Sequence, residues 1–172
     1  MTRVLLLIDL QNDYFPGGAF PLWNAEAVLE ACVGAIARAH AVGIPVVHIQ
    51  HVADASQGLA PFFNAGTPGV AIHPRVLAAA PEAPVVVKAY ADSFHQTTLE
   101  ATLKALGATE LLVAGMMTQN CVTHTALSKA AEGCAVTVLS DACTTVSELL
   151  HLIALHALST RVKLVPSVDA LP

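Results

Sequence analysis

The chain has 172 residues, of which 55% are hydrophobic and 12% charged, and its formal net charge is −5. This length fits one domain, residues 1–172, and is enough to bury a substantial core. No basic cluster is present, which argues against nucleic acid as a partner. The longest apolar run near the N-terminus, residues 4–8, is far short of the roughly 20 residues of a membrane span. We therefore expect a soluble cytoplasmic protein, and we attribute its excess of apolar residues to homo-oligomerisation as a dimer or tetramer.

Short apolar runs alternate along the chain with segments of helical period. The expected strands cover residues 4–8, 44–49, 84–87, 111–114, 135–139 and 162–165, and the expected helices cover residues 25–42, 97–106, 121–132 and 147–158. Asn24 is the expected N-cap of the first helix, and Gly43, Gly107 and Gly133 are expected to end helices. Residues 51–74 form a long loop of the kind that often builds pocket walls or lids. The alternation predicts an α/β fold, Rossmann-like and three-layered, with a mainly parallel six-stranded sheet and right-handed crossovers.

Three reactive side chains directly follow or closely follow expected strands: Asp9, Lys88 and Cys121. In an open α/β sheet, ligands bind outside the carboxyl ends of the strands. Each residue alone also has a structural interpretation, as a turn former, a solvated charge and a core thiol. Together they supply a nucleophile, a carboxylate to take its proton and a cation to hold a charged form. At the start of the expected helix, backbone N–H groups would favour a Cys121 thiolate and could hold an oxyanion.

Four segments give the chain a clear resemblance to the isochorismatase-like cysteine hydrolases, the nicotinamidase/isochorismatase superfamily. They are residues 6–15 (LLIDLQNDYF), Val87-Lys88 with Ser93-Phe94, residues 115–126 (GMMTQNCVTHTA) and Ser140-Asp141-Ala142. The resemblance implies that Asp9 is the general base and acid, Lys88 the electrostatic partner and Cys121 the nucleophile. It also implies a cis peptide between Met116 and Met117, and an oxyanion hole made by the backbone N–H groups of Met117 and Cys121. The implied reaction is hydrolysis of an amide or related C–N bond of a small molecule through a thioester.

The chain departs from the nicotinamidases of this family, which carry a metal site built on an Asp-x-His pair after the second strand. Here that segment contains His48 and His51 without an Asp-x-His pair, and His73 lies far downstream. A metal ligand needs convergent partners, so we interpret His48 and His51 as polar strand-end and loop residues. We therefore expect no metal and no cofactor. The expected walls of the substrate pocket are aromatic: Tyr14, Phe15 and Phe94, with Trp23, Phe62 and Phe63 as further candidates.

Three alternatives remain open from the sequence. The first is a nicotinamidase-type amidase with a bound metal, which a chelator would inactivate. The second is a member of the fold that only binds a ligand, although such a protein has no reason to keep all three reactive groups. The third is a thiol redox protein that uses Cys121. It would need a resolving thiol, for which Cys134 is too far along the expected helix and Cys143 would serve only if folding brings it close.

Overall fold

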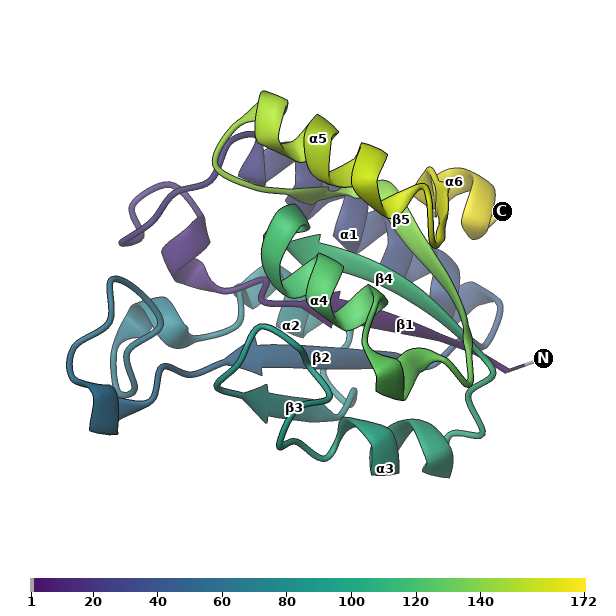
Figure 1. Cartoon of the computed structure of the whole chain (residues 1–172), viewed down its shortest axis with the longest axis horizontal. Coiled ribbons are helices and arrows are strands. Elements are labelled where there is room, and N and C mark those ends of the chain that lie inside the picture. Colours follow the sequence, from purple (N-terminus) through teal and green to yellow (C-terminus); the bar gives the residue numbers. More distant parts are fainter. Residues whose placement is uncertain (1) are drawn as a thin grey trace.

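The computed structural model of the protein describes residues 2–172 and contains one six-stranded sheet (Figure 1). Its strands are β1 (Arg3–Ile8), β2 (Val46–His51), β3 (Val85–Lys88), β4 (Glu110–Met116), β5 (Ala135–Thr144) and β6 (Lys163–Val165). The order across the sheet is β3-β2-β1-β4-β5-β6, and every neighbouring pair is parallel. The central strands are continuous apolar runs, as expected for strands that are buried on both faces.

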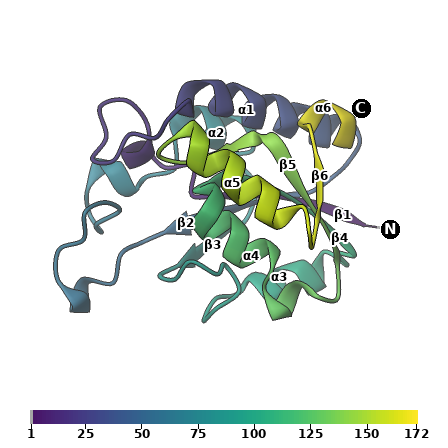
Figure 2. The same ribbon diagram turned by 45° about the horizontal axis from the view of Figure 1, so that its top comes forward.

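Helices cover both faces of the sheet. One face carries α1 (Ala25–Ala41), α2 (Pro74–Ala79) and α6 (Ser167–Ala170), and the other carries α3 (Leu99–Ala105), α4 (Thr123–Ala126) and α5 (Glu148–Leu158) (Figures 1 and 2). Alternate residues of β1 enter the two cores: Leu5 and Leu7 pack on the α1 side, and Leu6 and Ile8 on the α3–α5 side. The predicted α/β class with a parallel six-stranded sheet is confirmed. Within residues 2–172, no helix is long and apolar enough to cross a membrane.

The strand order reverses beside β1. The chain builds β1, β2 and β3 outward in one direction, and then returns to place β4 on the other side of β1. Such a reversal leaves a crevice at the carboxyl ends of the two central strands, where α/β proteins bind ligands. Gly115, near the end of β4, has φ +124°, and a Cβ there would lie 2.0 Å from the carbonyl oxygen of Ile8. Only glycine therefore allows the two strands to approach this closely.

The expected helix over residues 121–132 is wrong. The structure has a π-helical turn at Thr118–Val122, the four-residue helix α4, and a separate 3₁₀ turn at Lys129–Ala131. The break falls at Ser128, whose hydroxyl donates to Asp92 Oδ2 at 2.8 Å and accepts from the N–H of Ala130. Serine side chains that bond to nearby groups in this way compete with helical hydrogen bonding. Cys121 consequently lies inside a π-helical turn, not at the first turn of a long helix.

Two other expectations need correction. Asn24 precedes α1 in a left-handed conformation, with φ 55°, and its side chain makes no capping hydrogen bond. Strand β5 continues past the polar pair Ser140-Asp141, where it was expected to end, as far as Thr144. Asp141 is accommodated there because its two carboxylate oxygens accept from the backbone N–H and the hydroxyl of Ser167, at 2.7 and 2.8 Å. The short helices α2 and α6 were not predicted.

Candidate active site

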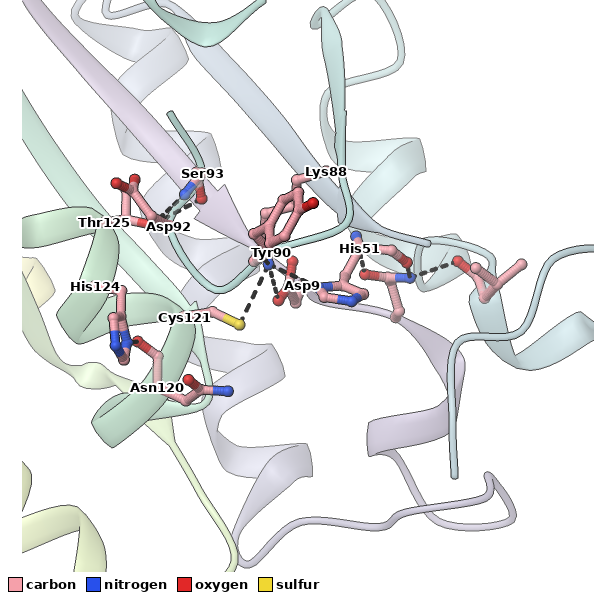
Figure 3. Close-up of polar contacts among 12 residues, drawn as sticks. Asp9, His51, Lys88, Tyr90, Asp92, Ser93, Asn120, Cys121, His124 and Thr125 are labelled. Carbon is pink, nitrogen blue, oxygen red and sulfur yellow. Dashed lines mark hydrogen bonds and ion pairs between the residues drawn. The ribbon is translucent and has the colours of Figure 1, made fainter. Parts of the chain in front are cut away.

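Asp9, Lys88 and Cys121 meet at the carboxyl edge of the sheet (Figure 3). The Lys88 ammonium lies 2.9 Å from Asp9 Oδ2 and 3.2 Å from the Cys121 sulfur. All three residues are buried, with exposed fractions of 0% for Asp9, 2% for Lys88 and 3% for Cys121. A buried ammonium therefore contacts both a carboxylate and a thiol, an arrangement that can activate a cysteine as a nucleophile.

The sheet topology explains how residues so distant in sequence come together. Asp9 follows β1 and adopts a left-handed conformation with φ 52°. Cys121 belongs to the turn that follows β4, the neighbour of β1. Lys88 ends β3, which is separated from β1 by β2. Its long side chain is therefore what spans the second strand and reaches the central crevice.

The protonation states of the site follow from burial and from the neighbouring charges. Burial alone lowers the pKa of Lys88, but the Asp9 carboxylate and the Cys121 sulfur outweigh it, so that the pKa lies above its ordinary value. Burial and the nearby Asp9 carboxylate raise the pKa of the Cys121 thiol. In the resting site the amine is therefore charged and the thiol is protonated. Asp9 Oδ1 is buried and has no hydrogen-bond partner within residues 2–172, so it is the oxygen that is free to take a proton.

His51 is a fourth member of the site that our sequence interpretation missed. Its Nδ1 lies 3.0 Å from the Lys88 ammonium, and Figure 3 shows its ring beside Asp9. His51 and Lys88 are register partners, as the last residues of β2 and β3. The sequence offered only a weak signal, because Lys88 directly follows an apolar run but His51 lies two residues beyond the expected strand of residues 44–49. It could be used only with the knowledge that β2 lies between β1 and β3.

The polar residues after Asp9 fix the surrounding loops. The Gln11 side chain accepts from the N–H of His51 and donates to its carbonyl oxygen, at 2.8 and 2.7 Å. The Asn12 amide donates to the carbonyl of Pro68. The Asp13 carboxylate accepts from the N–H groups of Ala19 and Phe63. Residues 11–13 thus tie the surrounding loops together.

The aromatic residues expected in the pocket differ in their surroundings. Tyr14 is 1% exposed and packs on Phe63, with ring centroids 4.5 Å apart. Burial, with a smaller contribution from the Asp9 carboxylate, raises the pKa of its phenol group. Phe15 packs on His73 and lines an open cavity whose walls include none of the three reactive residues. Phe94 is half-buried against the core on the α3–α5 side. A contact between substrate and Tyr14, Phe15 or Phe94 stays a prediction.

The peptide bond between Met116 and Met117 is cis. It joins the end of β4 to the π-helical turn that carries Cys121, and both methionines are buried. The roles of the backbone N–H groups of Met117 and Cys121 as an oxyanion hole stay a prediction.

The metal site of the nicotinamidases raises the question of whether this site fits a metal ion. Within residues 2–172, Asp9, His51 and Cys121 form the one group of three potential ligands whose donor atoms all lie within 4.8 Å of one another. The Lys88 ammonium, however, lies 2.9, 3.0 and 3.2 Å from donor atoms of these same residues. A metal ion bound about 2 Å from each ligand would meet this positive charge at close range. The donor set is already occupied by a cation of the chain itself, and it does not fit a metal.

Comparisons with known proteins agree with this fold. A family model of the isochorismatase domain matches residues 3–169. The isochorismatase family protein YddQ of Bacillus subtilis is 39% identical over 145 residues, which cover 84% of this chain and 79% of that protein. The nicotinamidase/pyrazinamidase of Mycobacterium tuberculosis is 30% identical over 176 residues, which cover 92% of this chain and 95% of that protein. The crystal structure of an isochorismatase hydrolase from Oleispira antarctica matches with a TM-score of 0.88 and 34% identity, covering 99% of this chain and 96% of that one.

The fold and the matches define the class of this protein as a hydrolase of the α/β type. The chain belongs to the isochorismatase family.

Proposed function

We propose that this protein is a metal-independent cysteine hydrolase that cleaves an amide or related C–N bond of a small molecule. The observation that carries the proposal is the buried Lys88 ammonium, which contacts both the Asp9 carboxylate and the Cys121 sulfur. A lysine in this position keeps a carboxylate ionised and stabilises a thiolate when it forms. A protein that only bound a ligand would gain nothing from enclosing these three groups together.

In the proposed reaction, the Cys121 sulfur attacks the carbonyl carbon of the substrate while its proton passes to Asp9. Lys88 stabilises the negative charge as it moves from the carboxylate to the sulfur. Asp9 then gives the proton to the nitrogen that leaves, and the acyl group remains on Cys121 as a thioester. Water attacks the thioester with Asp9 as its base, and the acid departs as the sulfur recovers a proton. Each half of the reaction, acylation and deacylation, ends with Asp9 ionised and Lys88 charged, as in the resting site.

The tetrahedral intermediates carry an oxyanion that needs hydrogen-bond donors. We assign this role to the backbone N–H groups of Met117 and Cys121, in line with the family resemblance of residues 115–126. Removal of one oxyanion donor typically costs about 10²- to 10³-fold in kcat.

Two further observations support the C–N bond and the lack of a metal. A relative that covers 92% of this chain is named a nicotinamidase/pyrazinamidase. In this chain the Lys88 ammonium lies beside the Cys121 sulfur in the crevice. The ammonium of Lys88 occupies the position between the three potential metal ligands. The charge that a metal would supply at this point is therefore already provided by the side chain.

The test is ammonia release from a panel of small primary amides, ureides and carbamoyl compounds. Wild type is compared with Cys121→Ala, and with Cys134→Ala as a matched control, because Cys134 is a free, partly exposed thiol outside the site. Each protein is assayed with a chelator and again with added divalent metal ions. We expect turnover that survives the chelator, is lost in Cys121→Ala and persists in Cys134→Ala.

Two results would count against the proposal. Turnover that the chelator abolishes and metal restores would mean that the reaction depends on a metal after all. Failure of every compound in the panel would contradict the proposed class of substrate.

A further inference from the structure

The Lys88 ammonium is surrounded by more acceptors than it has protons. Its nitrogen lies 2.9 Å from Asp9 Oδ2, 3.0 Å from His51 Nδ1, 3.0 Å from the carbonyl oxygen of Tyr90 and 3.2 Å from the Cys121 sulfur (Figure 3). An ammonium group has three N–H donors and no acceptor. Four groups therefore compete for three protons, and the arrangement of those protons decides which of them is stabilised.

The contact with Lys88 fixes the state of His51. Because the ammonium can only donate, His51 Nδ1 must be unprotonated, and the neutral ring carries its proton on Nε2. Burial and the positive charge of Lys88 both lower the pKa of His51, which agrees with a neutral ring at pH 7. The Gln11 side chain bonds both the N–H and the carbonyl oxygen of His51, so the backbone that carries the ring is fixed in place.

No other charged group competes for the ring within residues 2–172. The titratable groups that face it are Asp9 from the end of β1, Lys88 from β3 and Cys121 from the π-helical turn. The loop after β2 contributes the ring of Phe63, whose centroid is 5.8 Å from that of His51. His51 is thus enclosed between an apolar wall and the three reactive residues.

We propose that His51 is a positioning residue that acts through Lys88, by holding one ammonium proton throughout the reaction. The carbonyl of Tyr90 holds a second proton, since a backbone oxygen does not change its charge. One proton then remains, and it is directed at the pair formed by Asp9 and Cys121. This inference rests on the proposed role of Cys121 as the nucleophile.

The arrangement gives the third proton two positions that match the two halves of the reaction. With Asp9 ionised and the thiol protonated, it binds the carboxylate, which is the stronger acceptor. Once the thiol proton has passed to Asp9, the negative charge is on sulfur, and the same N–H turns to the thiolate. Without an acceptor at position 51, the ammonium could rotate and would no longer direct this proton. With His51 protonated, an N–H would face the ammonium at 3.0 Å and the contact would break.

The first test is the pH dependence of kcat/KM on the best amide of the panel. His51→Asn places an amide oxygen near the position of Nδ1 and cannot titrate, whereas His51→Leu provides no acceptor. We expect wild-type activity to fall in acid, with an inflection below the ordinary histidine pKa of about 6.5, because burial and the charge of Lys88 lower the pKa of His51. His51→Asn should stay within a few-fold of wild type at pH 7 and lose this acid limb. His51→Leu should lose about 10- to 100-fold at every pH, as expected for loss of one hydrogen bond from a charged group.

The second test needs no substrate, so it separates this inference from the proposed function. The rate of Cys121 alkylation by iodoacetamide is followed against pH by peptide mass spectrometry, with Cys134 in the same molecule as the reference thiol. We expect an acid inflection in wild type that is absent in His51→Asn and retained in the control His40→Gln, which changes an exposed histidine of α1. If the alkylation profile shows the acid inflection but no amide is hydrolysed, the result would support the role of His51 beside Lys88 and refute the proposed hydrolase activity. Identical inflections in wild type and His51→Asn, or equal losses in the Asn and Leu variants at every pH, would overturn the inference.

Discussion

The ion pair of Lys88 and Asp9 has both side chains fully enclosed, with no exposed area on either. Removing two charges from water is expensive, and their attraction repays this cost only while both are present. A buried pair of this kind is poor evidence for stability, because two apolar groups would often serve as well. The pair is better explained by the ammonium and the carboxylate that it places beside Cys121.

Replacement of one partner should therefore be far more harmful than replacement of both. We expect Lys88→Met to lower the free energy of unfolding by about 3–5 kcal/mol, because Asp9 is left as an unpaired buried charge. Combining it with Asp9→Asn should recover most of that loss. Urea unfolding of the two single variants and the double variant measures these energies. Additive losses in the double variant would mean that the two charges are not coupled.

His48 provides a prediction on stability against pH. It is 1% exposed, its Nε2 donates to the carbonyl of Ala80 at 2.9 Å, and its Nδ1 has no partner within residues 2–172. Burial lowers its pKa, although the bond to Ala80 acts in the opposite sense. The unfolded chain therefore binds more protons than the folded one, and stability falls as pH drops below about 6.5.

His48→Gln keeps a donor for Ala80 and cannot titrate, so the fall in Tm between pH 7 and pH 5 should be smaller in this variant. His51 and His151, whose pKa values are also lowered chiefly by burial, still titrate in both proteins and leave a residual slope. An unchanged slope in His48→Gln would contradict this account.

At the scale of the elements, the site depends on the close approach of β1 and β4. These strands pair in register from Arg3 with Glu110 to Ile8 with Gly115, and the catalytic candidates follow their ends. The turn after β4 is held from the other side by α5, where the Thr118 hydroxyl lies 2.9 Å from His151 Nδ1. The position of Cys121 is thus fixed by the packing of two strands and one helix.

Gly115→Ala tests this contact. The new Cβ would lie 2.0 Å from the Ile8 carbonyl oxygen, in a conformation with φ +124° that L-residues rarely adopt. We expect a loss of about 3 kcal/mol or more in the free energy of unfolding, because the strands must separate. Gly133→Ala is the matched control, since a Cβ there meets no atom within 4 Å. Equal stability of the two variants would show that β1 and β4 can separate at little cost.

The strands were predictable because buried parallel strands are short apolar runs that glycines and polar residues interrupt. The positions of Asp9 and Lys88 at strand ends followed directly from those runs. Helix ends were less predictable where side chains bond to distant loops. Ser128 breaks the expected helix through Asp92, and Asp141 remains in a strand through Ser167. Neither partner can be inferred from the local sequence.

The role of His51 shows the same limit within the site. A histidine just beyond an expected strand is ordinary. The role of His51 depends on the strand order, which places β2 between the strands that carry Asp9 and Lys88. The π-helical turn around Cys121 likewise depends on tertiary contacts, and the sequence of this segment has an ordinary helical period.

At the scale of the whole molecule, part of the excess of apolar residues lies on the outer face of α5. Leu149 is 70% exposed, Leu152 55% and Ile153 56%. Homo-oligomerisation stays a prediction, and this face is where we expect a second copy to pack.

Light scattering should give a mass of two or four times 17.8 kDa. Leu149→Glu combined with Ile153→Glu should yield the monomer, and Val168→Glu on α6 should not. A monomeric wild type would refute the prediction.

The central claim is that Cys121 forms a thioester with the acyl part of the substrate. The most direct measurement uses two amides that share one acyl group but release different amines, each hydrolysed in the presence of hydroxylamine. Both amides give the same thioester once the amine has left, so hydroxylamine and water compete for the same intermediate. We predict the same ratio of hydroxamate to acid from both amides. A ratio that changes with the leaving amine would mean that no common acyl-enzyme forms, and would contradict the mechanism.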